Sequence, residues 1–287
     1  MELLERLTAE AADFRPDATE SQLWRQLQWL DRLELALPGV DGDASTSPQV
    51  RRLQSLRMRV ESSHRALYAR LRADLRQGAG IERLSSLLGA HVPDAGGAGS
   101  DEEEGFDALD ELMAGILQLP PPGAPSVRLE ANMVAYQPTP ARHVLDLLRR
   151  CALGTQDVLV DLGAGLGHVP LLAALCSPAR SCGIEIEPAY VRSARAVADE
   201  LGLDRVSFLC QDVREADLSV GTVFYLYTPF RGELLAQVLE RLHHEAATRR
   251  VRICAFGPCA LALQPLSWLQ AEGEVRPGRI TVFEAAG

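Results

Sequence analysis

An acid followed by spaced glycines marks the first place in the chain where the residue types suggest a ligand site. Asp161 ends the apolar run VLVD, and glycines follow at positions 163, 165 and 167. The apolar run predicts a buried parallel strand over 158–161. Glycines let the backbone approach a ligand and adopt positive φ, and the next helix offers free N–H groups. Strand, turn and helix together predict the first unit of a nucleotide-binding α/β sheet.

Two further carboxylates follow the next two expected strands. Glu185 lies 22 residues after Gly163, near the end of an expected strand over 181–186. A carboxylate at that place can accept from both hydroxyls of a ribose. Glu187 has a different expected role, as the cap of the helix that begins at Pro188. Asp212 follows an expected strand over 206–211.

The glycine spacing separates two kinds of cofactor. Dinucleotide-binding folds carry G-x-G-x-x-G, but His168 stands where the third glycine belongs. The pattern D-x-G-x-G-x-G instead resembles motif I of the class I S-adenosylmethionine-dependent methyltransferases. The segment NMVAYQPTPARHVLDLLRRC, directly before the first strand, resembles motif X of the same family. A structural turn in another α/β enzyme is the alternative for the first motif, and a plain capped helix for the second.

The resemblance implies a cofactor, S-adenosylmethionine, and a role for each matching residue. Asp161 faces the methionine end, and the glycine loop lies beneath it. Glu185 binds the ribose, Asp212 accepts from the adenine amine, and the backbone N–H of Val213 faces the ring. For Asp212 the alternative is a turn-forming residue. Thr139 is also an expected helix N-cap, with Pro140 at the first helical position. The remaining implied cofactor residues are Tyr136, Gln137, Thr139, Gly163, Ala164, Gly165 and Gly167.

The acceptor should lie beside the residues that follow the fourth strand, where Tyr227 and Phe230 are the catalytic candidates. The sequence YTPF there is a poor match to the N-P-P-Y/F motif, because Thr228 replaces the asparagine and one proline is missing. The phrases GIEIEPAYVRSA and ADLSVGTVFYLYTPF are more similar to non-SET lysine methyltransferases, in which aromatic rings favour a cationic amine. The residues from 224 to 226 are expected to be packing residues. The sequence identifies no general base and shows no metal-ligand spacing.

These residues need a sheet to position them. Strands are expected at 158–161, 181–186, 206–211, 221–227 and 250–256, with helices between them, then a short helix over 263–270 and a hairpin about Pro277-Gly278. The resemblance covers about 130–287 and implies an α/β, Rossmann-like sheet of seven strands. The expected domains are a helical one at 1–91, a glycine-rich and acidic linker at 92–105 and a methyltransferase domain at 106–287.

The N-terminal domain is predicted to be all-α. Apolar residues recur at helical spacing over 20–37 and 48–76, and a further helix is expected at 106–119. Nine arginines lie between 51 and 83. They are either a docking surface for an acidic partner or RNA, or a solvated face whose stems cover apolar surface, which we favour. Seven acids between Asp101 and Glu111 are candidates for pairing with them.

Composition narrows the class of protein. No apolar run reaches the length of a membrane span, and Glu2 and Glu5 occupy the place where a signal peptide is basic, which indicates a cytoplasmic protein. The net charge of −10 weighs against a nucleic-acid substrate. The six cysteines lack C-x-x-C spacing, which favours reduced, buried thiols. All 29 basic residues are arginine, typical of a G- and C-rich, bacterial genome.

The sequence therefore predicts an S-adenosylmethionine-dependent enzyme that methylates a nitrogen or oxygen atom, with a protein side chain as one candidate acceptor. Two alternatives remain open. One is a small-molecule methyltransferase whose N-terminal helices form a substrate lid. The other is a scaffold of the same fold that binds the cofactor or a partner without turnover. The acceptor and the oligomeric state are not specified by the sequence.

Overall fold

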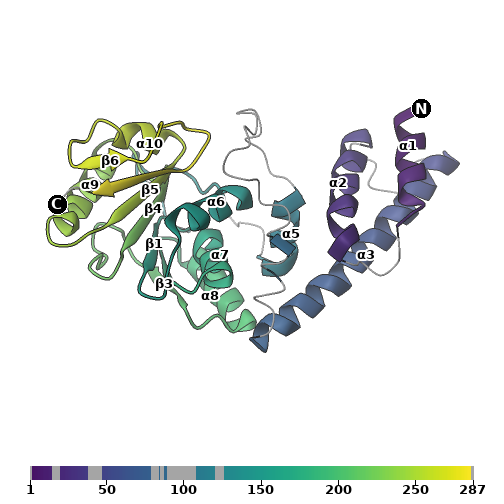
Figure 1. Ribbon diagram of the computed structural model, residues 1–287, viewed down its shortest axis with the longest axis horizontal. Helices are drawn as coiled ribbons and strands as arrows, with labels where there is room; N and C mark the ends of the chain where they lie inside the picture. The colour runs from purple at the N-terminus through teal and green to yellow at the C-terminus, as the bar shows by residue number, and fades with distance from the viewer. Residues whose placement is uncertain are drawn as a thin grey trace. The chain divides into compact units, whose positions relative to one another are not determined.

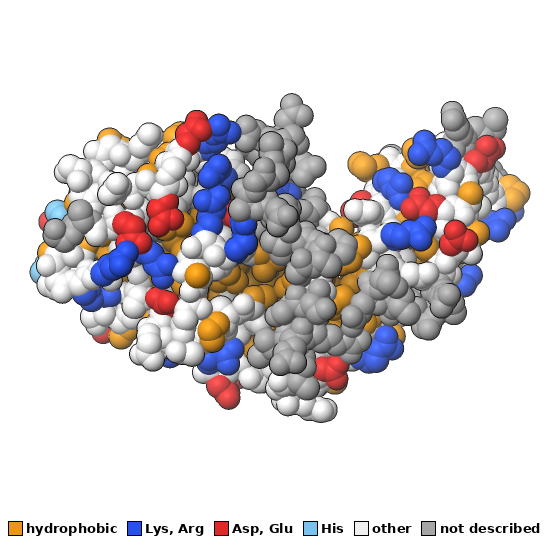
Figure 2. Space-filling view, viewed as in Figure 1, with side chains coloured by type: hydrophobic (Ala, Val, Ile, Leu, Met, Phe, Trp, Pro, Cys, Tyr) orange, Lys and Arg blue, Asp and Glu red, His pale blue; other side chains and the backbone are white. Residues whose placement is uncertain are grey.

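The computed structural model describes residues 2–14, 20–37, 47–78, 84, 87–88, 108–119 and 126–285. They form two compact units, one of N-terminal helices and one built on a sheet (Figure 1). The linker expected at 92–105 lies outside the described residues. No helix in the described ranges is long and apolar enough to cross a membrane. Side chains of both charge signs lie on the visible face of each unit (Figure 2).

The N-terminal unit contains four described helices. They are α1 (Glu2–Ala11), α2 (Glu20–Ala36), α3 (Pro48–Arg76) and α5 (Ala108–Leu117). The helix predicted over 48–76 is confirmed, with Pro48 in its first turn. Trp29, Leu7 and Leu53 are buried in the core shared by α1, α2 and α3, and the Trp29 indole donates to the Leu7 carbonyl oxygen at 2.9 Å.

Helix α5 packs against α2 and α3. The buried Arg72 of α3 donates to the carbonyl oxygens of Ile116 and Leu117, which end α5 without a partner inside their own helix. Phe106–Gln118 therefore group with the N-terminal helices. The expected boundary placed 106–119 in the methyltransferase domain instead. A helix that follows the linker in sequence can still bury its apolar face in the core that precedes the linker.

The second unit is built on a seven-stranded sheet of order β3-β2-β1-β4-β5-β7-β6. Strands β1 to β5 are parallel, and β7 lies antiparallel between β5 and β6. The order reverses between β1 and β4, so their carboxyl ends make the switch point at which open α/β sheets bind ligands. The strands are β1 (Val158–Leu162), β2 (Arg180–Glu185), β3 (Val206–Cys210), β4 (Val223–Tyr227), β5 (Arg252–Phe256), β6 (Leu269–Ala271) and β7 (Thr281–Ala285).

Helices cover both faces of this sheet (Figure 1). Because side chains alternate along a strand, Val160 and Phe224 join the core that contains the buried residues of α9, while Asp161 and Tyr225 point to the opposite face. That alternation places Asp161 and Tyr225 together beside β1 and β4. The helices are α6 (Ala141–Cys151), α7 (His168–Cys176), α8 (Pro188–Leu201), α9 (Gly232–Ala246) and α10 (Pro258–Leu263).

The C-terminal elements correct one expectation. The short helix expected over 263–270 is absent there: α10 ends at Leu263, and Leu269–Ala271 form β6. Pro258 starts the helix directly after β5, and pairing with β7 extends the chain at 269–271. The end does consist of two paired antiparallel strands, as predicted, but the first of them, β6, lies at 269–271 and not in the segment 273–276 that directly precedes Pro277-Gly278. All six cysteines are free; Cys210 is exposed and Cys176 half-buried, and the other four are buried as expected.

Candidate active site

The glycine loop between β1 and α7 has the backbone geometry that its sequence predicts. Gly163, Gly165 and Gly167 all have positive φ, at 95°, 54° and 83°. A side chain at Gly165 would place its Cβ 2.1 Å from the Tyr136 ring. The N–H groups of Gly163 and Ala164 donate to the Ile184 carbonyl oxygen at 2.9 and 3.0 Å, which ties the loop to the end of β2.

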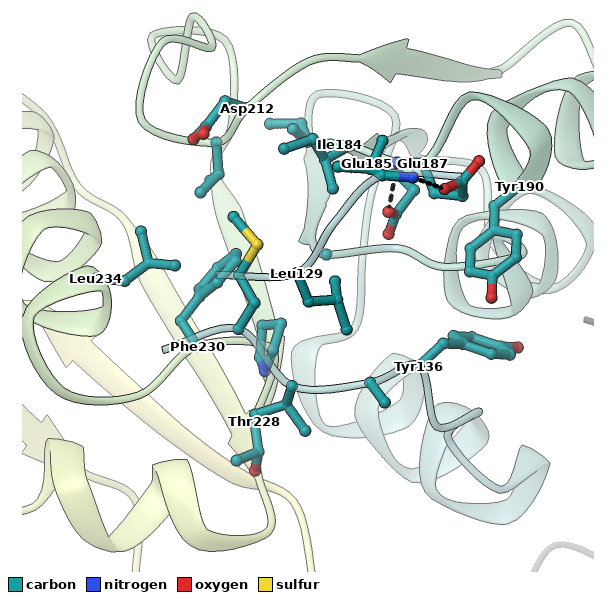
Figure 3. Close-up of a pocket in the computed structure, with 18 of the residues that line it drawn as sticks. Leu129, Tyr136, Ile184, Glu185, Glu187, Tyr190, Asp212, Thr228, Phe230 and Leu234 are labelled. Atoms are coloured by element: carbon teal, nitrogen blue, oxygen red, sulfur yellow. Dashed lines mark hydrogen bonds between the residues drawn. The ribbon is translucent and has the colours of Figure 1, made fainter. Parts of the chain in front are cut away.

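Glu185 lies at the carboxyl end of β2, next to this loop. Its carboxylate accepts from the Gly165 N–H and from the Glu187 N–H, each at 2.8 Å. Burial raises its pKa, and the backbone donors only partly offset that effect. A carboxylate has about four acceptor positions, so capacity remains for further donors. Figure 3 shows Glu185 among the residues that line the cavity.

Glu187 caps α8, as its position predicts, and also binds a distant segment. Its carboxylate accepts from the Ala189 N–H at 3.1 Å, from the Ser126 N–H and hydroxyl at 2.6 Å each, and from the Val127 N–H at 2.9 Å. Desolvation opposes ionisation of Glu187, but these bonds outweigh it and lower its pKa to about 2. The sequence alone gave no sign of the second role.

Residues 126–134, here called the strap, run along the carboxyl edge of the sheet from Glu187 to β4. The Val134 N–H donates to the Pro229 carbonyl oxygen at 3.1 Å, and the Arg231 N–H donates to the Asn132 carbonyl oxygen at 2.8 Å. An antiparallel bridge pairs Met133 with Phe230. The strap thus forms one wall of a cavity whose other walls come from the glycine loop and the ends of β2, β3 and β4.

This main cavity encloses about 890 Å³, counting the part open to solvent. Glu185 and Glu187 lie at one side of it, Asp212 at another, and Phe230 and Leu234 close a third (Figure 3). The Tyr136 and Tyr190 rings lie 5.4 Å apart, centroid to centroid. The strap contributes apolar side chains, namely Val127, Leu129, Met133 and Val134.

Asp212 lines this cavity, but its carboxylate already has a cationic partner. Arg214 donates to it through the backbone N–H at 2.8 Å and through the guanidinium at 2.6 Å. These bonds and the arginine charge lower the pKa of Asp212. The same guanidinium reaches Glu130 of the strap at 2.9 Å. Val213 lines the cavity as well, although it is buried in the core and its carbonyl oxygen accepts from Arg241 at 2.6 Å.

A smaller cavity adjoins the loop on the other side of Tyr136 and contains Asp161. Asp161 is 4% exposed, and burial together with the nearby Glu185 charge raises its pKa to about 8. The Tyr136 hydroxyl and the His168 Nδ1 share a hydrogen bond of 2.9 Å. Burial lowers the pKa of His168 to about 4, so its ring is neutral near pH 7. Gln137 lines both cavities.

Thr139 also lines the smaller cavity, but it is not the helix cap that we expected. Its hydroxyl is hydrogen-bonded to the Tyr225 hydroxyl at 3.0 Å, and α6 starts at Ala141 with Pro140 in the cap position. The sheet face that carries Tyr225 supplies a buried partner for the threonine, which a local capping rule does not include.

The two catalytic candidates in the segment after β4, Tyr227 and Phe230, lie in different environments. Tyr227 is half-buried, lines both cavities and packs on the Phe256 ring at 4.7 Å. Phe230 is 7% exposed and belongs to the apolar core, although one side of it faces the main cavity. Thr228, between them, has a φ of 43°, which is strained for a β-branched residue.

Comparison with known proteins places this geometry in a family. Residues 154–243 match the model of a methyltransferase domain. That segment holds the glycine loop, Glu185, Asp212 and the end of β4, and the sheet has the seven strands and the antiparallel end that the resemblance implies. The chain carries a class I, S-adenosylmethionine-dependent methyltransferase domain.

Two relatives illustrate the range of methyltransferases that are similar to this domain. A tRNA (guanine-N(7)-)-methyltransferase of Synechococcus sp. is 32% identical over 148 residues, which are 49% of this chain and 57% of that protein. A protein-lysine N-methyltransferase of Saccharolobus islandicus is 30% identical over 96 residues, 33% of this chain and 60% of that protein. The chain thus spans less than two thirds of either relative.

A solved structure is also similar. An RNA methyltransferase from Salinibacter ruber, crystallised with S-adenosyl-L-homocysteine, has 30% identity and a TM-score of 0.43. The match covers 52% of this chain and 92% of that chain.

The methyltransferase domain unites the predicted residues and adds some that the sequence did not show. Tyr136, Gln137, Gly163, Glu185, Asp212, Val213, Tyr227 and Phe230 line the main cavity, and Asp161, Thr139 and Ala164 line the smaller one. Gly165 and Gly167 shape the loop without lining either. The strap, Arg214 and the Tyr136–His168 pair were missed. Apolar residues of the strap do alternate with polar ones over 127–133, which predicts an extended segment but not its partners. Arg214 bonds to Asp212 two residues away, but its second partner, Glu130, and the partners of the strap and of Tyr136 are distant in sequence.

Proposed function

We propose that the protein transfers the methyl group of S-adenosylmethionine to a nitrogen or oxygen atom of an acceptor. The observation that carries this proposal is the position of Glu185, whose carboxylate is fixed by the Gly165 and Glu187 N–H groups at the rim of the main cavity. It keeps free acceptor capacity beside the glycine loop. A structural turn needs no carboxylate in that place.

The residues present fit this cofactor in kind and in number. Glu185 is assigned to the ribose hydroxyls, and Asp212 and the Val213 N–H to the adenine. Asp161 in the smaller cavity is assigned to the methionine end, where a cationic ammonium would oppose the effects that raise its pKa. Tyr136, Gln137 and Thr139 are assigned to covering that end, and the loop from Gly163 to Gly167 to lying beneath it.

When bound, S-adenosylmethionine supplies a methyl group that is already activated by a sulfonium. The protein's part is therefore to hold the acceptor in line and to exclude water. Tyr227 is assigned this role because it is half-buried and faces both cavities. Phe230 and Met133 form an apolar floor for the same space. No side chain is assigned as a general base.

Two classes of acceptor have support. The Tyr227 ring suits a cationic amine such as a lysine side chain, the acceptor named for the Saccharolobus relative. The Synechococcus relative is named for a guanine of tRNA, and RNA is the second candidate. We also propose that the strap keeps the cofactor in place while either acceptor approaches.

A labelling experiment tests the function and sorts the acceptors. Purified protein and methyl-labelled cofactor are added to a cell extract, and portions are then treated with protease or with ribonuclease. Protease-sensitive label identifies a protein acceptor, ribonuclease-sensitive label an RNA, and label in an organic extract a small molecule. The Glu185→Ala variant is the control and should lose most of the label. Absence of label despite tight cofactor binding would support the scaffold alternative instead.

A further inference from the structure

Helix α3 has two faces of opposite character. One face is buried against the rest of the N-terminal unit and includes Val50, Leu53, Val60, Leu67, Leu71 and Leu75. The opposite face is exposed and carries Arg51, Arg52, Arg59, Arg65, Arg70 and Arg76. At 100° per residue, these arginines fall within an arc of about 140° that excludes the buried face. Several basic side chains of this unit are visible at its surface (Figure 2).

The charge of α3 is opposite to that of the whole chain. The helix contains eight arginines and two acids, Glu61 and Asp74, which gives it a net charge of +6, whereas the chain carries −10. Glu61 pairs with Arg57, at the edge of the exposed face. Among the described residues, no ion pair involves Arg51, Arg52, Arg59, Arg65 or Arg70.

The exposed arginines form two parallel rows. Arg52, Arg59 and Arg70 share one line along the helix, and Arg51, Arg65 and Arg76 share a second. At 1.5 Å per residue, the distance from Arg51 to Arg76 is about 37 Å. This is the dimension of an extended polyanion that can contact several cations at once, rather than that of a single bound phosphate.

The position of the arginines argues against one structural role for them. Arginine stems can shield apolar surface, but these arginines lie opposite the buried residues of their own helix. Glu111 lies at the described end of the acidic run near residue 101. Glu111 has a raised pKa because of burial and then the charges of Asp31 and Glu34 on α2, so acids rather than arginines dominate its surroundings.

We propose that the exposed face of α3 is a docking surface for the phosphate backbone of RNA. The inference deepens the proposed function and rests on it, because the docked RNA would carry the methyl acceptor. The net charge of the chain does not oppose this, since phosphate binding depends on the local density of cations. Contacts of this kind position a nucleic acid without reading its sequence.

The test compares two triple variants that remove equal charge. Arg52→Gln/Arg59→Gln/Arg70→Gln removes one row of α3. Arg180→Gln/Arg192→Gln/Arg250→Gln removes three exposed arginines from the other unit. All six substituted side chains are exposed, and on the helices glutamine has nearly the propensity of arginine, so both variants should fold. Binding of a labelled single-stranded RNA is measured by fluorescence anisotropy over a series of salt concentrations, with polyglutamate as the competing polyanion and calorimetry of S-adenosylhomocysteine as a separate readout.

For single strands each phosphate contact contributes about 0.7 to the slope of log affinity against log salt. The α3 triple variant should therefore lose about two units of slope and roughly a hundredfold in affinity at 0.1 M salt. The matched variant should lose much less. Equal losses in both variants, or no RNA binding by the unaltered protein, would overturn the proposal. Tighter binding of polyglutamate than of RNA would assign the surface to an acidic protein instead. Failure to bind S-adenosylhomocysteine, with RNA binding intact, would refute the proposed function but leave the surface assigned.

Discussion

Glu187 at the start of α8 accepts hydrogen bonds from both the backbone N–H and the hydroxyl of Ser126, each at 2.6 Å. The two residues are 61 positions apart, and their contact fixes one end of the strap beside the second strand. The far end is fixed by backbone bonds to Pro229 and Arg231. The wall of the main cavity thus depends on a carboxylate that contacts no part of the glycine loop.

The strap gives a prediction about stability. Glu187→Gln removes the charge from a buried acceptor of four hydrogen bonds, so the free energy of unfolding should fall by roughly 2–3 kcal/mol at pH 7. Because the folded pKa of Glu187 is lowered to about 2, this contribution is present above pH 4.5 and is lost as pH falls towards 2. Urea unfolding at pH 7 and pH 3 measures both values.

Glu130→Gln is the matched control for this change. The Glu130 side chain is 54% exposed in its pair with Arg214, and exposed pairs contribute about 0–1 kcal/mol. If the two variants unfold at the same urea concentration, the Glu187 contact with the strap is not what holds that wall.

The raised pKa of Asp161 leads to a prediction about how folding stability depends on pH. Burial and the Glu185 charge raise its folded pKa to about 8, so the folded state binds more protons than the unfolded state between about pH 4 and pH 8. The contribution of Asp161 to the stability of the ligand-free protein should therefore fall as pH rises through that window. Below pH 6.5 the buried His64 and His168, whose pKa values are lowered to about 4, contribute the opposite slope, so the comparison is made from pH 6.5 to pH 8. In thermal scans over that range the Tm of the unaltered protein should fall more than the Tm of Asp161→Asn, and an equal fall in both would contradict the assignment.

Tyr227 and Phe230 should separate in their effects, since one faces the cavities and the other is mostly in the core. Tyr227→Ala should lower turnover by at least tenfold and keep most of the affinity for the cofactor. Phe230→Ala should cost about 3–5 kcal/mol of stability, because it leaves a cavity between β4 and α9. Phe230→Leu keeps the core filled and therefore reports on turnover alone. Normal turnover in both Tyr227→Ala and Phe230→Leu would remove this segment as the acceptor wall.

The sheet could be predicted from the sequence because local patterns mark its parts. Apolar runs indicate the strands, and glycines and acids indicate where the strands end. Asp161, Glu185 and Asp212 end neighbouring strands, and parallel strands bring their carboxyl ends to one edge. Local rules failed where a distant partner competes. Thr139 bonds to Tyr225 instead of capping α6, and residues 269–271 pair with β7 instead of continuing a helix.

The strap shows the limit of sequence reasoning most clearly. Its place is set by Glu187, Arg214 and the backbone at Pro229, all far from it in sequence. Nothing in the spacing of residues 126–134 indicates these partners. Glu187 lies two residues beyond the expected ribose ligand. The sequence predicts that it caps α8, and in the structure it also binds Ser126 of the strap.

Glu185 is the group proposed to bind the ribose of the cofactor, and calorimetry of one variant tests this role. The unaltered protein should bind S-adenosylmethionine and S-adenosylhomocysteine and show no binding of NAD. A hydrogen bond to a charged acceptor contributes about 1.5–3 kcal/mol, so Glu185→Ala should weaken S-adenosylhomocysteine binding by roughly tenfold to a hundredfold. Affinity within threefold of the unaltered protein, in a variant with the same Tm, would show that Glu185 does not hold the cofactor.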